Sequence, residues 1–306
     1  MNALDQPRTA DARAILARGS VSFNFAGRFL PADRRDDAAV VYAFCRYVDD
    51  LADEAADLDE ARQALTALSA ELRKEKAPRP FISDVLALFD RCDIDVRHAL
   101  NLIEGVASDL QLVRVKDDAE LVQYSYRVAG TVGLMMSGVL GVRDAASTPF
   151  AIDLGVAMQL TNICRDVAED ARNDRIYLPQ TRLEGHGIPM QPESLRQHRE
   201  GVRRVVQDLL AMADRYYESA MNGMRYIPWR ARLAIVVAAQ VYRAIGVKLL
   251  RDGGDALAGR TVVPLSGKLY WAAHGVWLAV VSIPFRRRPH VAALHRSLAG
   301  LPGVHG

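Results

Sequence analysis

The chain has 306 residues, half of them hydrophobic, which suffices for one large domain or two ordinary ones with a sizeable core. Charged residues make up 25% and argue against wholesale disorder, while a formal net charge of +2 gives no reason to expect a nucleic-acid partner. Cys45, Cys92 and Cys164 lack metal-ligand spacing and predict a reducing compartment without disulfides. The N-terminus lacks the basic-then-apolar pattern of a signal peptide, so we expect an intracellular protein.

A short helix is expected over residues 10–18, closed by Gly19, and a polar and aromatic segment follows it. The hydroxyls of Ser20 and Ser22 in this segment could meet phosphate oxygens. The alternative, in which Ser20 simply caps the next helix, has equal support from the sequence.

The first acidic helix is expected over residues 36–56. Tyr42, Arg46, Asp49 and Asp53 fall at i, i+4, i+7 and i+11 along it, which places them on one stripe of a 3.6-residue period. Asp50 stands beside this stripe. The two aspartates of the pair are one turn apart, so both carboxylates can reach one cation.

The middle of the chain predicts further helices over residues 59–74, 80–90 and 96–112, and a capping box at 117–120 that opens the next one. Asp109 is either a further acid for the site or a solvated helix end. The following helix contains Gly130 and Gly133, each of which costs about 1 kcal/mol relative to Ala in mid-helix. We expect these glycines to serve close packing, a kink or the wall of an apolar tunnel, and we favour the tunnel.

The second acidic helix begins near residue 150, after a hydroxyl cap and a proline at residues 147–149. Gln159, Asn162, Asp166 and Asp170 lie at i, i+3, i+7 and i+11 on one stripe, with Arg165 beside them. Amides and acids along one stripe do not make an ordinary core face, because buried carboxylates need partners.

Beyond the second acidic helix, Arg175 is expected to fold back toward the acids, and residues 180–192 predict a long loop. Helices are expected over 192–226 and 229–251, the latter with Tyr242 facing either a cavity or the core. Arg260 and Lys268 would either clamp a diphosphate or be surface charges. No segment shows a convincing strand pattern, so the prediction is an all-α protein.

Residues 269–285 are almost continuously apolar and lead into three arginines at 286–288. About 17 residues is the lower limit for spanning a bilayer. A basic flank on an apolar, tryptophan-bearing helix suits an interfacial anchor, and a buried C-terminal helix explains the pattern equally well.

The two acidic pairs point to metal-dependent chemistry on a diphosphate. One such pair alone is weak evidence, because acids at i and i+4 are common on solvated helix faces. Two pairs in apolar surroundings, each with an arginine, form a much rarer coincidence. Carboxylates on opposite walls of a cavity can hold Mg²⁺, which keeps waters and binds phosphate oxygens, and which neutralises a leaving diphosphate.

Four segments together resemble the squalene/phytoene synthases: YAFCRYVDDLAD (42–53), YRVAGTVG (126–133), QLTNICRDVAED (159–170) and RIYLP (175–179). They occur in the order found in that family, and the resemblance covers about residues 15–270. It implies the all-α isoprenoid synthase fold, with two aspartate-rich helices facing each other across a central cavity. We expect one domain over residues 1–306, with 269–288 as an apolar and basic C-terminal segment.

The resemblance also implies roles for individual residues. The metal ligands would be Asp49, Asp53, Asp166 and Asp170, assisted by Asp50. The diphosphates would be held by Arg46, Arg165, Arg175 and, less directly supported, Ser20, Ser22, Arg260 and Lys268. The reacting pocket would be lined by Tyr42, Phe23, Tyr126, Gln159, Asn162 and Tyr242.

The reaction implied is the head-to-head condensation of two prenyl diphosphates through a cyclopropyl diphosphate, assisted by Mg²⁺ or by Mn²⁺ in its place. The segment around the two glycines resembles bacterial phytoene synthases most, which favours two geranylgeranyl diphosphates giving phytoene. The alternative is condensation of two farnesyl diphosphates to presqualene diphosphate, squalene or dehydrosqualene. The sequence lacks a Gly-x-Gly-x-x-Gly fingerprint, so NADPH is not expected for the first of these reactions.

Two other hypotheses fit the sequence less well. A non-catalytic scaffold of this fold should have lost aspartates, and all four are present. Single-substrate cyclases and chain-elongating synthases usually carry other aspartate patterns. We therefore expect a monomeric cytoplasmic enzyme, with a peripheral contact to the inner face of the membrane as a further hypothesis.

Overall fold

The computed structural model describes residues 11–19, 30–283, 286 and 288–304. Ser20, Ser22 and Phe23 lie outside the described residues. The described residues form helices, and their one β-type pairing is an isolated bridge between Arg114 and Ile176. The all-α prediction is therefore confirmed.

The helices of the first half follow one another with short connections. In chain order they are α1 (Ala12–Gly19), α3 (Ala32–Asp53), α4 (Leu58–Leu72), α5 (Pro80–Cys92), α6 (Val96–Ser108), α7 (Asp118–Ser125), the π-helix η2 (Tyr126–Gly130) and α8 (Thr131–Val139).

The second half begins with the 3-10 turn η3 (Ala145–Ser147) and one of the two longest helices. The series continues as α9 (Thr148–Arg172), α10 (Gln180–Glu184), α11 (Pro192–Gln197), α12 (Arg199–Gly223), η4 (Met224–Tyr226), α13 (Trp229–Arg251), α14 (Leu265–Trp277), the π-helix η5 (Leu278–Ser282) and the 3-10 helix η7 (Ala292–Leu298).

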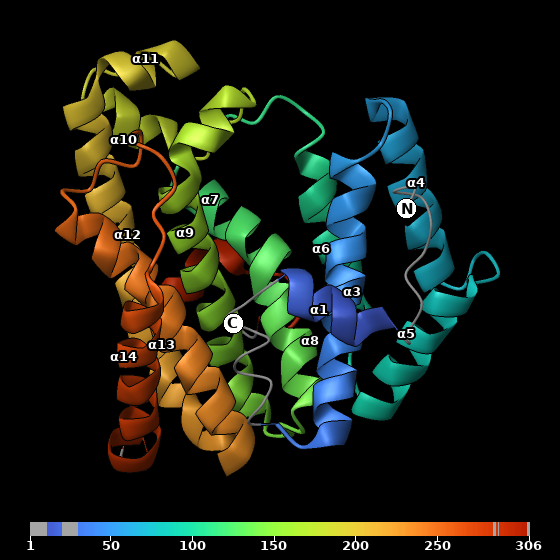
Figure 1. The fold of residues 1–306 in the computed structure, drawn as a ribbon. Coiled ribbons are helices and arrows are strands. Elements are labelled where there is room, and N and C mark those ends of the chain that lie inside the picture. Colours follow the sequence, from blue (N-terminus) through green and yellow to red (C-terminus); the bar gives the residue numbers. More distant parts are fainter. Residues whose placement is uncertain (1–10, 20–29, 284–285, 287, 305–306) are drawn as a thin grey trace.

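The two acidic helices lie on either side of the middle of the molecule, α3 toward the blue end of the fold and α9 in green (Figure 1). α8 contacts both of them, and α9 also packs against η2, α12 and α13. One hydrophobic core includes side chains of α3, α4, α5, α6 and α8, and a second includes side chains of α7, α9 and α12. The space between α3 and α9 is thus framed by two separate cores.

Side-chain caps fix where several of these helices begin. Asp57 accepts hydrogen bonds from the backbone N–H groups of Asp59 and Glu60 at the start of α4. Asp117 accepts one from the N–H of Glu120 at the start of α7, as the capping-box pattern predicts. The Glu120 carboxylate in turn accepts a hydrogen bond from the N–H of Lys116, one residue before the cap.

The glycine-containing segment is kinked by the π-helix η2, where the hydrogen-bond ladder shifts by one residue. A Cβ on Gly133 would lie 2.4 Å from the carbonyl oxygen of Ala151, and one on Gly155 would lie 2.2 Å from that of Ala129. These two glycines therefore let α8, η2 and α9 approach closely.

Several helix boundaries differ from the sequence expectation, including those of α3, expected over residues 36–56, and of α6, expected over 96–112. The segment expected to be a loop begins with α10, a helix of five residues, and the helix expected from residue 192 is interrupted at His198. The hydroxyl of Ser147 donates to the carbonyl of Asp144 in place of capping α9. Cys45, Cys92 and Cys164 are free.

The helix α14 packs along α13 at the edge of the molecule (Figure 1). Its outer side chains are exposed, with Tyr270 at 65% and Trp277 at 54%, and Val280 in η5 follows at 65%. One described helix, α13, is long and apolar enough to cross a membrane, and 56% of its apolar window is buried inside the fold.

Candidate active site

An acidic cavity of about 170 Å³ lies between α3 and α9. Five carboxylates, two amides, two tyrosines and one arginine line it, with a few apolar side chains; the polar residues are Asp49, Asp53, Asp109, Tyr124, Gln159, Asn162, Asp166, Asp170, Arg175 and Tyr177. The structure thus brings together the two aspartate pairs that the sequence placed on separate helices.

Each pair reaches the cavity because its helix turns once between the two residues. Asp49 and Asp53 lie in the last two turns of α3, and Asp166 and Asp170 lie in the last two turns of α9. Apolar neighbours such as Val48 and Val167 are buried in the two cores and hold the helices in place. The aspartate stripe therefore faces the gap between the cores.

The carboxylates of this cavity lack sufficient positive charge. Burial raises the pKa of Asp49 to about 7, against the attraction of Arg46 and with repulsion from Asp53, Asp50 and Asp109 adding to the rise. Burial, followed by repulsion from Asp166, raises the pKa of Asp170 to about 7 as well. A bound cation would reverse both effects, because it stabilises the ionised carboxylates.

The arginines are distributed unequally over the four aspartates. Arg165 binds Asp166 with two hydrogen bonds, one of them 2.8 Å long, and Arg260 approaches the same carboxylate to 3.3 Å. Arg175 lines the cavity and lies 3.9 Å from Asp53. Arg175 thus folds back toward the acids, as the sequence predicts, and Arg260 is a half-exposed side chain beside the second aspartate pair.

Arg46 pairs with an aspartate outside the two predicted metal-binding pairs. Its guanidinium forms an ion pair of 2.5 Å with Asp50, one turn along α3, and is half exposed. Arg46 is absent from the residues that line the cavity, and Asp50, the expected assisting ligand, is absent with it. Both residues thus lie beside the acidic cavity and outside its lining.

Asp109 is the fifth carboxylate of the cavity and was left ambiguous by the sequence. Tyr124 donates a hydrogen bond of 2.8 Å to one of its oxygens, and Tyr177 donates one of 2.7 Å to the other. Burial raises the pKa of Asp109 above its ordinary value although both hydroxyls oppose the rise. Sequence reasoning missed Tyr124 and Tyr177; the only signal was that Tyr177 lies within the family-like segment 175–179 and Tyr124 two residues before the segment 126–133.

An apolar cavity of about 320 Å³ adjoins the acidic one. The two share Asp49, Gln159 and Asn162 in their linings. The apolar walls come from η2, α8, α9, η4 and α13, including Val128, Val132, Gly133, Met136, Phe150, Leu154, Met158, Met224 and Ile235. Gly133 lies in this wall as expected, whereas Gly130 packs beside Tyr126 and Ile152 and does not line the cavity.

A chain of hydrogen bonds crosses the boundary between the two cavities. Tyr242 donates to the side-chain oxygen of Asn162 over 3.1 Å, and the Asn162 amide donates to Gln159 over 3.3 Å. Tyr42 and Tyr242 both line the apolar cavity near this point. The structure therefore places Tyr42, Gln159, Asn162 and Tyr242 together, as the sequence predicted.

Two predicted pocket residues lie elsewhere. Tyr126 is fully buried, and its hydroxyl donates a hydrogen bond of 2.5 Å to the carbonyl of Pro302, so it ties η2 to the C-terminal segment. Lys268 lies in the first turn of α14 and lines neither cavity. Tyr126 does not line the apolar cavity because it lies in the π-helix η2, where Val128 and Ala129 face the cavity in its place.

Comparisons with known proteins identify relatives along most of the chain. Residues 16–267 match the family described as squalene/phytoene synthase. A 15-cis-phytoene synthase of Pantoea ananas is 36% identical over 85% of this chain and 89% of its own length. A phytoene synthase of Thermus thermophilus is 38% identical over 80% of this chain and 84% of its own length.

Solved structures agree with this match. A dehydrosqualene synthase superposes with a TM-score of 0.78 at 27% identity, covering 87% of this chain and 94% of its own. A squalene synthase from Alicyclobacillus acidocaldarius superposes with a TM-score of 0.73 at 25% identity, covering 82% and 98%.

The helical fold and the paired cavities thus define an enzyme of the isoprenoid synthase class. Within that class, the chain belongs to the squalene/phytoene synthase family.

Proposed function

We propose that this protein is a phytoene synthase, which joins two geranylgeranyl diphosphates head to head through a cyclopropyl diphosphate. The observation that carries the proposal is the acidic cavity adjoining an apolar one, in a chain whose curated relatives are named phytoene synthases. The acidic cavity suits the diphosphate ends, and the apolar cavity suits the hydrocarbon chains.

The residues of the acidic cavity fit divalent metal ions such as Mg²⁺. All the candidate ligands are oxygen donors, which hard cations prefer, and no described histidine or cysteine lines this cavity. The raised pKa values of Asp49 and Asp170 mark a cavity with too little positive charge. Asp49, Asp53, Asp166 and Asp170 would hold Mg²⁺, or Mn²⁺ in its place. When bound, the metal supplies positive charge to the leaving diphosphate.

The chain's own residues account for the rest of the catalysis. Arg175 and Arg260 are placed to bind diphosphate oxygens, because guanidinium groups match phosphate geometry. Tyr242, Asn162 and Gln159 form the polar boundary at which the reacting carbons would lie. The aliphatic and sulfur-containing walls exclude water, which would otherwise capture a carbocation.

The second candidate function is condensation of two farnesyl diphosphates to a C30 product. It is favoured by the two structural matches, a dehydrosqualene synthase and a squalene synthase. The higher identity to phytoene synthases places it second. Neither cavity lining carries a glycine-rich dinucleotide fingerprint, and the proposed reaction needs no reductant.

Product analysis tests the proposal. Purified protein is incubated with Mg²⁺ and either geranylgeranyl or farnesyl diphosphate, each with and without NADPH. A C40 hydrocarbon formed without NADPH is the expected result. A C30 product formed from farnesyl diphosphate alone would overturn the choice of substrate, and no product from either would overturn the enzyme assignment.

The proposal includes a monomer that meets the membrane surface, where its apolar substrates and product would partition. The exposed apolar side chains of α14 and η5, including Tyr270, Trp277 and Val280, form one candidate contact. Sedimentation with anionic vesicles should be reduced by Trp277→Ser and unchanged by Leu112→Ser, a matched exposed site on another face. Equal binding of both variants would contradict this contact.

A further inference from the structure

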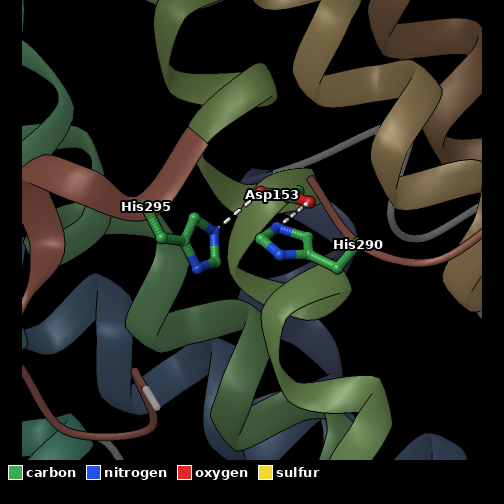
Figure 2. Close-up of side chains that lie close together, drawn as sticks. All are labelled: Asp153, His290 and His295. Atoms are coloured by element: carbon green, nitrogen blue, oxygen red, sulfur yellow. Dashed lines mark hydrogen bonds and ion pairs between the residues drawn. The ribbon is translucent and has the colours of Figure 1, made fainter. Parts of the chain in front are cut away.

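A group of metal-binding residues lies outside both cavities. Asp153 of α9 lies between His290 and His295, which belong to the C-terminal segment after α14, and each imidazole points to a different oxygen of the carboxylate (Figure 2). One ligand atom from each lies within 4.8 Å of the others. Asp153 lines neither cavity, so this group is separate from the proposed active site.

The Asp153 carboxylate is fully buried, and the charges around it are unusual. Its only ion-pair partners in the described part of the chain are the two imidazoles, with no lysine or arginine nearby enough to pair. A buried carboxylate without a compensating charge is strongly unfavourable. The compensating charge must therefore come from an imidazolium or from a bound cation.

The hydrogen-bond geometry favours a cation. His295 Nε2 lies 2.8 Å from one Asp153 oxygen, which is a normal hydrogen bond. His290 Nε2 lies 3.2 Å from the other oxygen, yet both of these atoms are buried without any hydrogen-bond partner. These two atoms therefore lie within ion-pair distance without forming a well-aligned hydrogen bond.

A bound metal ion would satisfy these two unpaired atoms, and His295 Nε2 would then bind the metal in place of its hydrogen bond to Asp153. Ligands of Zn²⁺ lie about 2.0–2.2 Å from the metal, so neighbouring donors in a tetrahedral site are about 3.3 Å apart without bonding each other. The contact of 3.2 Å between His290 and Asp153 matches this spacing. Two imidazole nitrogens and one carboxylate oxygen are also a donor set that suits Zn²⁺.

We propose that Asp153, His290 and His295 bind one Zn²⁺ ion, which fastens the C-terminal segment to α9. Elsewhere the segment is held by hydrogen bonds to its backbone, such as those from Tyr126 to Pro302 and from Tyr216 to Leu294, and by Leu298, which is buried in the core of α7, α9 and α12. His290 also packs edge-on against Phe150, whose other contacts include the apolar cavity. The ion therefore anchors the segment next to one wall of that cavity.

The test measures zinc directly in tag-free protein. The protein is purified from zinc-supplemented culture, exchanged into buffer with excess Mg²⁺ to occupy the acidic cavity, and analysed by mass spectrometry for metal content. Unaltered protein and His186→Gln, an exposed control, should retain one zinc per chain. Asp153→Asn and His295→Gln should bind zinc at least about ten-fold more weakly, since even the loss of a residue supporting a ligand costs that much.

Cobalt substitution reports the coordination geometry without any variant. Co²⁺ at this site should give the intense visible absorption of a tetrahedral site with nitrogen ligands, whereas Co²⁺ among the carboxylates of the acidic cavity should not. If Asp153→Asn and His295→Gln fail to fold, the less buried His290→Gln and the cobalt spectrum decide the matter.

Two results would overturn the proposal: zinc absent from the unaltered protein, or equal zinc in all variants. Each would leave the group as a pair of aspartate–histidine contacts without metal.

Discussion

The acidic cavity and the apolar cavity meet at Asp49, Gln159 and Asn162, yet their walls have opposite composition. The acidic cavity concentrates five carboxylates and relies on incoming cations and arginines to balance them. The apolar cavity is lined largely by aliphatic and methionine side chains. The comparison indicates that one cavity is built for charge and the other for excluding water, and that the reacting atoms belong at their shared boundary.

The largest expected effect comes from removing a carboxylate from the acidic cavity. Asp49→Asn should lower turnover by about 10³-fold, the equivalent of about 4 kcal/mol of metal-dependent stabilisation. The melting temperature of the metal-free protein should stay the same or rise, because burial disfavours the charge that is removed. Steady-state rates with Mg²⁺ and calorimetry check the two parts.

Asp59→Asn is the matched control, since that side chain is 82% exposed on α4. Its turnover should equal that of the unaltered protein. Near-normal turnover of Asp49→Asn would contradict the metal assignment of the first pair.

The second effect concerns the packing that shapes the apolar cavity. Gly155→Ala places a Cβ 2.2 Å from the backbone oxygen of Ala129, so α9 and η2 must separate, and the free energy of unfolding should fall by about 2 kcal/mol. Activity should fall with it, because both elements line the cavity. Chemical denaturation and turnover measure the two effects.

Gly246→Ala provides the comparison within another long helix. Its new Cβ would meet the end of the flexible Leu210 side chain at 2.9 Å, which can move. The free energy of unfolding should change by less than about 1 kcal/mol. Equal destabilisation by both substitutions would show that close backbone approach at Gly155 is not the cause.

A third effect is the dependence of metal binding on pH. In the metal-free fold, Asp49 and Asp170 have pKa values of about 7. In the unfolded chain the pKa of each returns to the ordinary 3.8, so the unfolded chain binds fewer protons between these two values. These two groups therefore lower the free energy of unfolding as pH rises through that window. Mg²⁺ requires the ionised form, so the rise in melting temperature that it causes should grow from about pH 6 to about pH 8. A metal effect independent of pH would contradict the raised pKa values.

The smallest effects separate two tyrosines that the sequence had placed in the same pocket. Tyr126→Phe loses a hydrogen bond to Pro302 and should cost about 1 kcal/mol of unfolding free energy with unchanged turnover. Tyr242→Phe loses the hydrogen bond to Asn162 at the cavity boundary and should reduce turnover by roughly ten-fold. Loss of turnover in Tyr126→Phe would show that the Tyr126 hydroxyl acts in the active site.

The features predicted correctly from the sequence are those that depend on the helical period alone. Asp49 with Asp53, and Asp166 with Asp170, lie one turn apart on helices that were recognised as such, so their shared faces followed directly. The all-α fold and the family were predicted for the same reason, because the segments that carry them are continuous.

Features that depend on packing between distant segments were not predicted. Asp109 enters the cavity only because α6 ends beside α3, and its partners Tyr124 and Tyr177 come from separate parts of the chain. Tyr126 was misplaced because the π-helix η2 rotates the side chains that a regular helix would have presented. Arg46 was expected to face the cavity, but it forms an ion pair with Asp50, one turn along the same helix.

The most direct test of the account is to locate metal ions in crystals grown with Mn²⁺ and a non-hydrolysable thiodiphosphate analogue of geranylgeranyl diphosphate. Anomalous scattering should place Mn²⁺ between the diphosphate and the carboxylates of both α3 and α9, with the prenyl chain in the apolar cavity. Mn²⁺ bound away from Asp49, Asp53, Asp166 and Asp170, or a prenyl chain outside the apolar cavity, would contradict the division of roles between the two cavities.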